Sequence, residues 1–166
     1  MIVRTATPQD APKMVALLND IIALGGSTAH QTPFNTARMV DHYITPALGV
    51  SCILLEEDGE LLGFQSLVMC DPNWQGEDAL PTDWAIIATF VSDQARGKGV
   101  GRALFDATLT AAKARKIPTI DATIRADNEL GLAYYNALGF KDYAILPAVS
   151  LADGTKVDRI RKRMDV

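Results

Sequence analysis

The spacing of apolar residues near the start of the chain predicts a short strand followed by a helix. Residues 2–6 are rich in β-branched side chains, which favour a strand. Apolar residues then recur at helical spacing, at Met14, Leu17, Leu18 and Ile21. We expect this helix to begin at Thr7-Pro8 and to end at Gly25-Gly26, because proline is tolerated at a helix start and glycine ends helices.

The apolar pattern then indicates a second helix and a hairpin. The second helix should begin with Thr36 as its cap and end before Pro46, because proline breaks a helix interior. Residues 50–56 and 60–69 have the composition of strands and flank Asp58-Gly59, a pair typical of tight hairpin turns.

The second half of the chain alternates strand-like and helix-like patterns. Residues 83–91 form a nearly all-apolar run, as is typical of a central strand. The remaining elements are a helix after residue 99, a strand over 118–124, a helix over 128–138 and closing strands over 140–146 and 157–164. This order predicts a single α/β domain over residues 1–166, with a mixed, mostly antiparallel sheet of about seven strands and about four flanking helices.

Composition and charge exclude several classes of protein. A chain of 166 residues, 48% hydrophobic and 22% charged, suits one compact core. The net charge of −4 and the lack of a separate Lys/Arg run argue against nucleic acid or membranes as partners. No apolar run approaches the ~20 residues of a membrane span, and residues 1–4 enter a strand rather than a signal peptide. We therefore expect a cytoplasmic protein.

The two cysteines and two histidines show no metal-ligand or disulfide pattern. Antiparallel pairing of the hairpin would place Cys52 near Gln65, and Cys70 about 17 Å farther along its strand. That separation exceeds disulfide reach. Together with His30 and His42, the cysteines lack metal-ligand spacing, so we expect no metal.

The segment Arg96-Gly97-Lys98-Gly99-Val100-Gly101 lies between the apolar strand and the next helix. Glycines let successive backbone N–H groups point at one anion, and the following helix adds its positive dipole end. The segment therefore predicts a phosphate site. It lacks the G-K-S/T ending of a Walker loop, and its G-x-G-x-G spacing and late position do not match the dinucleotide fingerprint.

The remaining pattern, R/Q-x-x-G-x-G/A after an apolar strand, resembles the acetyl-CoA pyrophosphate loop of the GCN5-related N-acetyltransferase superfamily. A second block, residues 127–140, resembles the N-x-x-A/G-x-x-x-Y-x-x-x-G-F element of that family. The resemblance is close over residues 83–140 and covers the first seventy residues only in the order of elements. It implies a sheet that splays open at the cofactor site.

The resemblance also implies a co-substrate, acetyl-CoA, and the residues that bind it. The pantetheine arm would bond to backbone groups of Phe90 and Val91, and the pyrophosphate would lie over residues 96–101. The implied cofactor-binding residues are Phe90, Val91, Arg96, Gly97, Lys98, Gly99, Val100, Gly101, Asn128 and Gly131.

The implied activity is acetyl transfer to a primary amine of a small molecule by direct attack. The alternatives are an enzyme that acetylates a protein or peptide amine, and a non-catalytic sensor that binds acyl-CoA. Homodimers are common in this family.

Helical spacing separates two adjacent tyrosines of the second block. Leu130, Ala133, Tyr134, Ala137 and Leu138 would share a buried stripe, whereas Asn128, Gly131 and Tyr135 would share a neighbouring face. Tyr135 also lies four residues before Gly139, as in the family pattern. We therefore expect Tyr135 to serve the leaving thiolate and Tyr134 to be a core residue.

Other candidate residues are less specific. Asp83 lies thirteen residues before Arg96, where the histone-acetylating branch of the family has a general-base glutamate, and a solvated strand-end aspartate is the alternative. The loops over residues 27–35 and 71–81 should select the substrate. Residues 26–34 loosely resemble the phosphinothricin and amino-acid branch, although glutamine occupies the position of its acid. The candidate substrate contacts are Thr28, His30 and Phe34.

Overall fold

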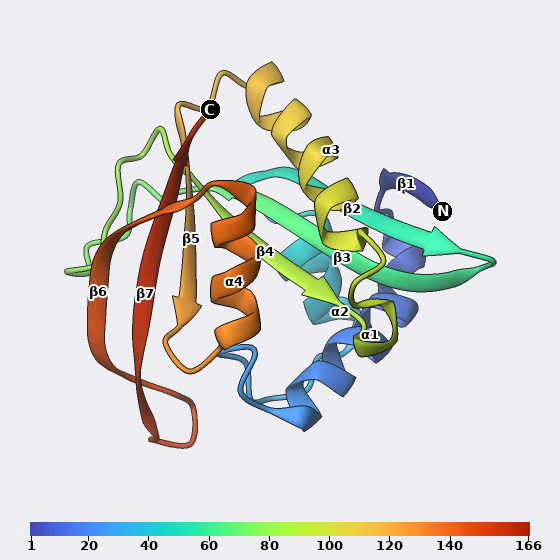
Figure 1. Ribbon diagram of the computed structural model, residues 1–166, viewed down its shortest axis with the longest axis horizontal. Coiled ribbons are helices and arrows are strands. Elements are labelled where there is room, and N and C mark those ends of the chain that lie inside the picture. Colours follow the sequence, from blue (N-terminus) through green and yellow to red (C-terminus); the bar gives the residue numbers. More distant parts are fainter.

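The computed structural model describes residues 1–166 and contains a seven-stranded mixed sheet with four α-helices (Figure 1). The strands are β1 (Ile2–Thr5), β2 (Gly49–Glu57), β3 (Glu60–Met69), β4 (Ala85–Val91), β5 (Thr119–Arg125), β6 (Lys141–Ser150) and β7 (Lys156–Asp165). They lie in the order β1-β2-β3-β4-β5-β7-β6, and every neighbouring pair is antiparallel except β4 and β5. The predicted fold class is confirmed.

The helices cover both faces of the sheet. They are α1 (Ala11–Leu24), α2 (Thr36–Met39), α3 (Val100–Ala114) and α4 (Glu129–Leu138), with short helical turns at Pro8–Asp10, Val40–Ile44 and Asp93–Ala95. Strand alternation divides the core between the faces. Cys52 and Leu54 of β2 pack with α1 and α2, whereas Ile53 and Leu55 pack with α3.

The parallel pair β4 and β5 meets at only one end. Ala85 pairs with Ile120 and Ile86 pairs with Asp121, and no further residues of the two strands are in register. β5 then continues along β7, to which it pairs over its whole length. The sheet therefore opens between β4 and β5 toward the glycine-rich segment of residues 96–101, here called the cradle, as expected.

Three local expectations differ from the structure. The second helix is capped by Asn35, not Thr36, because the Asn35 side chain accepts a hydrogen bond from the Arg38 amide at 2.8 Å. Cys52 lies opposite Ser66, one residue from the expected register. The closing strand β6 begins one residue later than expected and ends four residues later, and β7 is one residue longer at each end. Both cysteines are free and buried.

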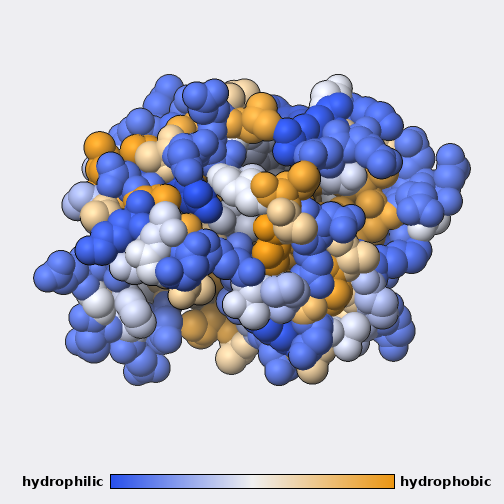
Figure 2. All heavy atoms as spheres, turned by 90° about the horizontal axis from the view of Figure 1, so that it is seen from below, coloured by the Kyte–Doolittle hydropathy of each residue, from blue (hydrophilic) through white to orange (hydrophobic).

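None of the helices has the length and apolar character needed to cross a bilayer. Seen from below the view of Figure 1, hydrophobic residues form several separate groups, one of them near the middle, on a surface that is mostly hydrophilic (Figure 2).

Candidate active site

A cavity of about 820 Å³ runs from the cradle, through the opening between β4 and β5, to β7. One end is lined by the cradle and the start of α3, and the middle by β4 and α4. The far end is lined by the loop after α1, by β5 and by β7. This cavity brings together most of the residues that the sequence singles out.

The cradle between β4 and α3 is an open arrangement of uncommitted backbone donors. Gly97 and Gly99 have φ of 76° and 78°, which only glycine adopts without strain, and open space surrounds both. The amides of Gly97, Gly99, Val100 and Gly101 make no hydrogen bond within the protein, and the last two belong to the first turn of α3. These donors fit a pyrophosphate.

The cations of the cradle have different positions. Arg96 lines the cavity and pairs with Asp93 through an exposed salt bridge. Lys98 is exposed and is not among the residues that line the cavity. Lys98 therefore lies outside the cavity in which the pyrophosphate is expected to bind.

Gly101 has no room for a side chain, because the Tyr134 ring lies against it. The sequence did not reveal this packing role. A Cβ at this position would lie 2.6 Å from Cε2 of Tyr134. The Tyr134 hydroxyl also donates to the Gly101 carbonyl at 2.8 Å. Gly101 thus accommodates the Tyr134 ring, whereas Gly97 and Gly99 leave space for a ligand.

The free backbone groups of β4 belong to Thr89 and Val91, not to Phe90. Just beyond β4, the Ser92 amide donates to the Leu62 carbonyl of β3 at 2.9 Å. Because backbone polar groups alternate in direction along a strand, those of Phe90 also face β3, with which it is in register. The groups of Thr89 and Val91 face the opening left by β5. Phe90 lines the cavity as a nearly buried ring instead.

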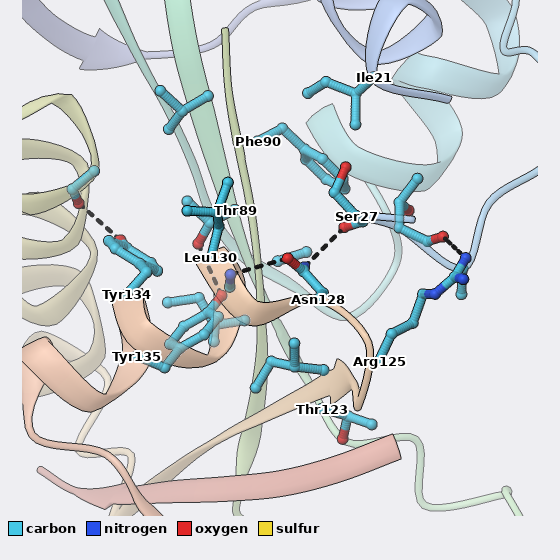
Figure 3. Close-up of a pocket in the computed structure, with 18 of the residues that line it drawn as sticks. Ile21, Ser27, Thr89, Phe90, Thr123, Arg125, Asn128, Leu130, Tyr134 and Tyr135 are labelled. Carbon is cyan, nitrogen blue, oxygen red and sulfur yellow. Dashed lines mark hydrogen bonds between the residues drawn. The ribbon is translucent and has the colours of Figure 1, made fainter. Parts of the chain in front are cut away.

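A hydrogen-bond network connects β3, β4, α3 and α4 at the centre of the cavity. Figure 3 shows the part of it that contains Thr89, Tyr134 and Tyr135. The amide nitrogen of Gln65 donates to the Thr89 hydroxyl at 2.8 Å and to the Tyr134 hydroxyl at 3.1 Å. Tyr134 in turn donates to the carbonyl of Gly101. The hydroxyl oxygens of Thr89 and Tyr135 are 2.8 Å apart.

The number of protons in this network leaves one unused. Gln65 contributes two N–H groups, and Tyr134, Thr89 and Tyr135 contribute one hydroxyl each. Four of these five protons make the four hydrogen bonds of the network. Gln65 and Tyr134 use all of theirs, so the remaining proton belongs to Thr89 or Tyr135, whichever accepts from the other. That hydroxyl can donate into the opening between the strands.

Burial keeps both tyrosines protonated. It raises the pKa of Tyr134 to about 12 and that of Tyr135 well above its usual value. Tyr135 is only 6% exposed, yet it lines the cavity. A hydroxyl of this kind is a proton donor at neutral pH rather than a base.

The expected division of the α4 faces is wrong, although Tyr135 still reaches the cavity. Leu130, Ala133 and Ala137 are exposed, and Tyr135 is the one fully buried residue of the helix. Tyr134 is half-buried and lines the cavity through its network contacts, so it is not a plain core residue. The buried side of the helix is the one that carries Tyr135, whose ring packs edge-on against that of Phe140 at 5.1 Å between centroids.

Asn128 and Gly131 line the cavity and organise its wall. The Asn128 side chain caps α4 by accepting from the Gly131 amide at 2.9 Å, and it donates to the Ser27 carbonyl at 3.2 Å. A Cβ at Gly131 would lie 2.5 Å from the Asn128 amide nitrogen. The pair therefore ties α4 to the loop after α1 (Figure 3).

The candidate substrate contacts divide into two groups. Thr28 and His30 line the cavity, and Thr28 is fixed by a hydrogen bond from Arg125 to its carbonyl at 3.0 Å. The Nε2 atom of His30 lies 2.6 Å from the Tyr43 hydroxyl, and burial lowers the pKa of His30 to about 4. Phe34, by contrast, is a core residue outside the cavity, because it packs between α1 and α2.

Asp83 does not reach the site. It is exposed in the turn before β4 and is not among the residues that line the cavity. The strand begins only at Ala85, and the cavity lies toward its other end. The structure thus gives Asp83 the solvated position that was the alternative.

Sequence reasoning missed Thr89, Gln65, Arg159 and Arg161. Thr89 had a visible signal, because it is the one polar residue in Ala85–Val91. The other three gave none, since their role depends on strand register and burial. No group of three or more His, Cys, Asp or Glu side chains is arranged to hold a metal ion.

Comparisons with known proteins agree with this geometry. The sequence model of the acetyltransferase (GNAT) family matches residues 20–140. An L-methionine sulfoximine/L-methionine sulfone acetyltransferase from Pseudomonas aeruginosa is 29% identical over 160 residues, covering 94% of this chain and 89% of the relative.

Solved structures show the same fold at low sequence identity. A ribosomal-protein-alanine N-acetyltransferase from Brucella melitensis superimposes with a TM-score of 0.80 at 22% identity, covering 100% of both chains. A phosphinothricin acetyltransferase from Sinorhizobium meliloti, in complex with acetyl-CoA, gives 0.79 at 20% identity, covering 99% of this chain and 88% of that one. The chain therefore belongs to the acetyltransferase (GNAT) family and is an acetyl-CoA-dependent N-acyltransferase.

Proposed function

We propose that this enzyme acetylates the primary amine of a small molecule, by direct attack of the amine on the thioester. The observation that carries this proposal is the Thr89–Tyr135 hydroxyl pair, which has one uncommitted proton beside the opening between β4 and β5. The cavity on the far side of that opening can hold a small acceptor. The relative from Pseudomonas aeruginosa is named for a small amino-acid derivative, which supports the same class of substrate.

The cradle and β4 fit the co-substrate. Acetyl-CoA, when bound, supplies the acetyl group as a thioester. The free amides of Gly97, Gly99, Val100 and Gly101 would hold its pyrophosphate. The backbone groups of Thr89 and Val91 would hold the pantetheine arm. As the C–N bond forms and the C–S bond breaks, the Thr89–Tyr135 pair would give its free proton to the sulfur. The proton that the attacking nitrogen loses would return to the pair through solvent.

Direct attack is favoured because the cavity holds no suitable thiol nucleophile. Neither Cys52 nor Cys70 lines it, and burial raises the pKa of these thiols to about 12 and about 11. Thiolates are the nucleophilic form of cysteine. An acetylated cysteine intermediate is therefore not part of the proposal.

A thiol-release assay tests the proposed function. Acetyl-CoA would be incubated with the enzyme and a panel of amino-acid derivatives, polyamines, aminoglycosides and peptides, while free thiol is recorded. We expect thiol release that depends on a small amine, with mass spectrometry showing one acetyl group on its nitrogen. Preference for peptides would contradict the small-molecule assignment, and binding of acetyl-CoA without acetyl transfer would favour a sensor.

A further inference from the structure

Two arginines of β7 are the only guanidinium groups of the cavity that have no carboxylate partner. Five arginines line the cavity. Three of them pair with nearby aspartates: Arg96 with Asp93, Arg102 with Asp106 and Arg125 with Asp127. Arg159 and Arg161 form no salt bridge.

Both side chains have hydrogen-bonding capacity left over, and that of Arg161 is held in place. Arg161 is only 8% exposed, and its Nη2 atom donates to the Asp78 carbonyl at 2.8 Å. The Nε atoms of Arg159 and Arg161 are buried and have no hydrogen-bond partner. Because the residues are two apart on one strand, both side chains leave the same face about 7 Å apart.

No carboxylate of the protein forms a salt bridge with this pair, although the buried Asp121 attracts Arg161 from a longer distance. Asp121 is the buried carboxylate on the adjacent strand, but its oxygens accept hydrogen bonds from Tyr143 and Thr123. Asp78 is the only acidic residue that lines the cavity, and its carboxylate accepts from the Trp74 indole at 2.7 Å. Burying a charge without a partner is costly, so a partner from outside the chain would relieve that cost.

We propose that Arg159 and Arg161 bind a carboxylate of the acceptor, so that the substrates are amines that also carry a carboxylate. The inference rests on the proposed function and specifies its substrate class. Guanidinium groups suit this role because their planar N–H donors match the two oxygens of a carboxylate. The arginines lie opposite Thr123 and Arg125 on β5, at the far end of the cavity from the cradle. An acceptor anchored there by its carboxylate can extend its amine toward the opening between the strands.

A matched pair of amines tests this inference. L-methionine sulfone and its primary amide differ in the charge of one group, and kcat/KM would be measured for both by thiol release. The wild-type enzyme should prefer the acid by 10- to 100-fold, as charged hydrogen bonds of this kind typically give. Arg161→Met and Arg159→Met should each lose at least tenfold on the acid, mainly through KM, and less than threefold on the amide.

Arg163→Met is the matched control on the same face of β7. Arg163 pairs with Asp165, stacks over Trp84 and is not among the residues that line the cavity, so this variant should keep the preference for the acid. Thermal unfolding adds a readout that needs no substrate. Arg161→Met should melt no lower than the wild type, because it removes a buried charge that has no salt-bridge partner. A much lower melting temperature would mean that Arg161 is structural and would overturn the proposal.

Failure of this inference can be distinguished from failure of the proposed function. Equal turnover of acid and amide by the wild type would overturn the carboxylate subsite and leave the function intact. If neither amine is acetylated although acetyl-CoA binds, calorimetry with N-acetyl-L-methionine sulfone decides the subsite separately. Binding that weakens at least tenfold in Arg161→Met would support the subsite, and its absence in the wild type would overturn it.

Discussion

The two adjacent tyrosines of α4 have different roles because their hydroxyl groups meet different partners. Tyr134 donates its proton to the Gly101 carbonyl and so joins α4 to the start of α3. The Tyr135 hydroxyl is hydrogen-bonded to that of Thr89, and one proton of this pair has no acceptor within the protein. Sequence spacing selected Tyr135 as the proton donor. Part of that argument was wrong, because the residues expected to form the buried stripe of the helix are largely exposed.

Replacing each tyrosine by phenylalanine should separate these roles. Tyr135→Phe removes the hydroxyl from the pair and should lower kcat by about tenfold to 10³-fold, with the Kd for acetyl-CoA within about threefold. Tyr134→Phe removes a contact to Gly101 and should lower the melting temperature while changing kcat much less. Steady-state kinetics and calorimetry check both. The reverse ranking of the two kcat values would assign the proton to Tyr134.

Asp83 gives a second kinetic prediction. Its carboxylate is exposed outside the cavity, so Asp83→Asn should keep kcat/KM within about threefold between pH 6 and 9. A general base would instead contribute about 10²- to 10⁴-fold. A loss of that size would show that the turn before β4 moves toward the acceptor in the working enzyme.

His30 makes stability depend on pH in a defined window. Burial, together with the nearby charges of His42, Arg38 and Arg159, lowers the pKa of His30 to about 4 from its ordinary 6.5. Between these values the unfolded chain binds a proton that the folded chain does not, so stability falls as the pH drops from 6.5 to 4. Urea unfolding across this range should show a shallower fall for His30→Phe. An identical slope would mean that other groups cause the pH dependence.

At the scale of elements, the cradle combines two kinds of glycine. Gly99 adopts a left-handed conformation beside open space, and Gly101 lies under the Tyr134 ring. The motif in the sequence does not distinguish them, because both match the family pattern. Their difference depends on how α4 packs against α3, which neighbouring residues in the sequence cannot reveal.

Substitutions at the two glycines should therefore fail in different ways. Gly99→Asp places a carboxylate in the cradle and should weaken acetyl-CoA binding by more than tenfold, ~1.4 kcal/mol, with a smaller loss of stability. Gly101→Ala pushes against Tyr134 and should cost about 1–3 kcal/mol of unfolding free energy. Calorimetry and urea unfolding of both variants separate the effects. Equal stability of Gly101→Ala and the wild type would contradict the packing role.

Apolar periodicity and turn residues predicted the type and order of the main elements correctly, because these signals are local. The central strand, the hairpin at Asp58-Gly59 and the helix after the cradle all form as expected. The site was only partly predictable. The cradle is a contiguous motif, whereas Gln65, Thr89 and Tyr135 come from three elements and meet only through strand register and helix rotation.

At the scale of the whole molecule, the sheet opening joins the proposed co-substrate site to the proposed acceptor site. The cradle and α3 lie on one side of the opening, and the loop after α1 and β7 line the other. The chain has a net charge of −4, yet the acceptor end is lined by unpaired arginines. This arrangement suits one transfer step between two ligands bound at the same time.

Transfer of a labelled acetyl group tests the central claim most directly. The enzyme would be incubated with L-methionine sulfone and acetyl-CoA carrying ¹³C in its acetyl group, and both product and protein would be analysed by mass spectrometry. The account predicts one labelled acetyl group on the amine nitrogen for each thiol released, and none on the protein. Thiol release without N-acetylated product, or label retained on a protein side chain, would contradict it.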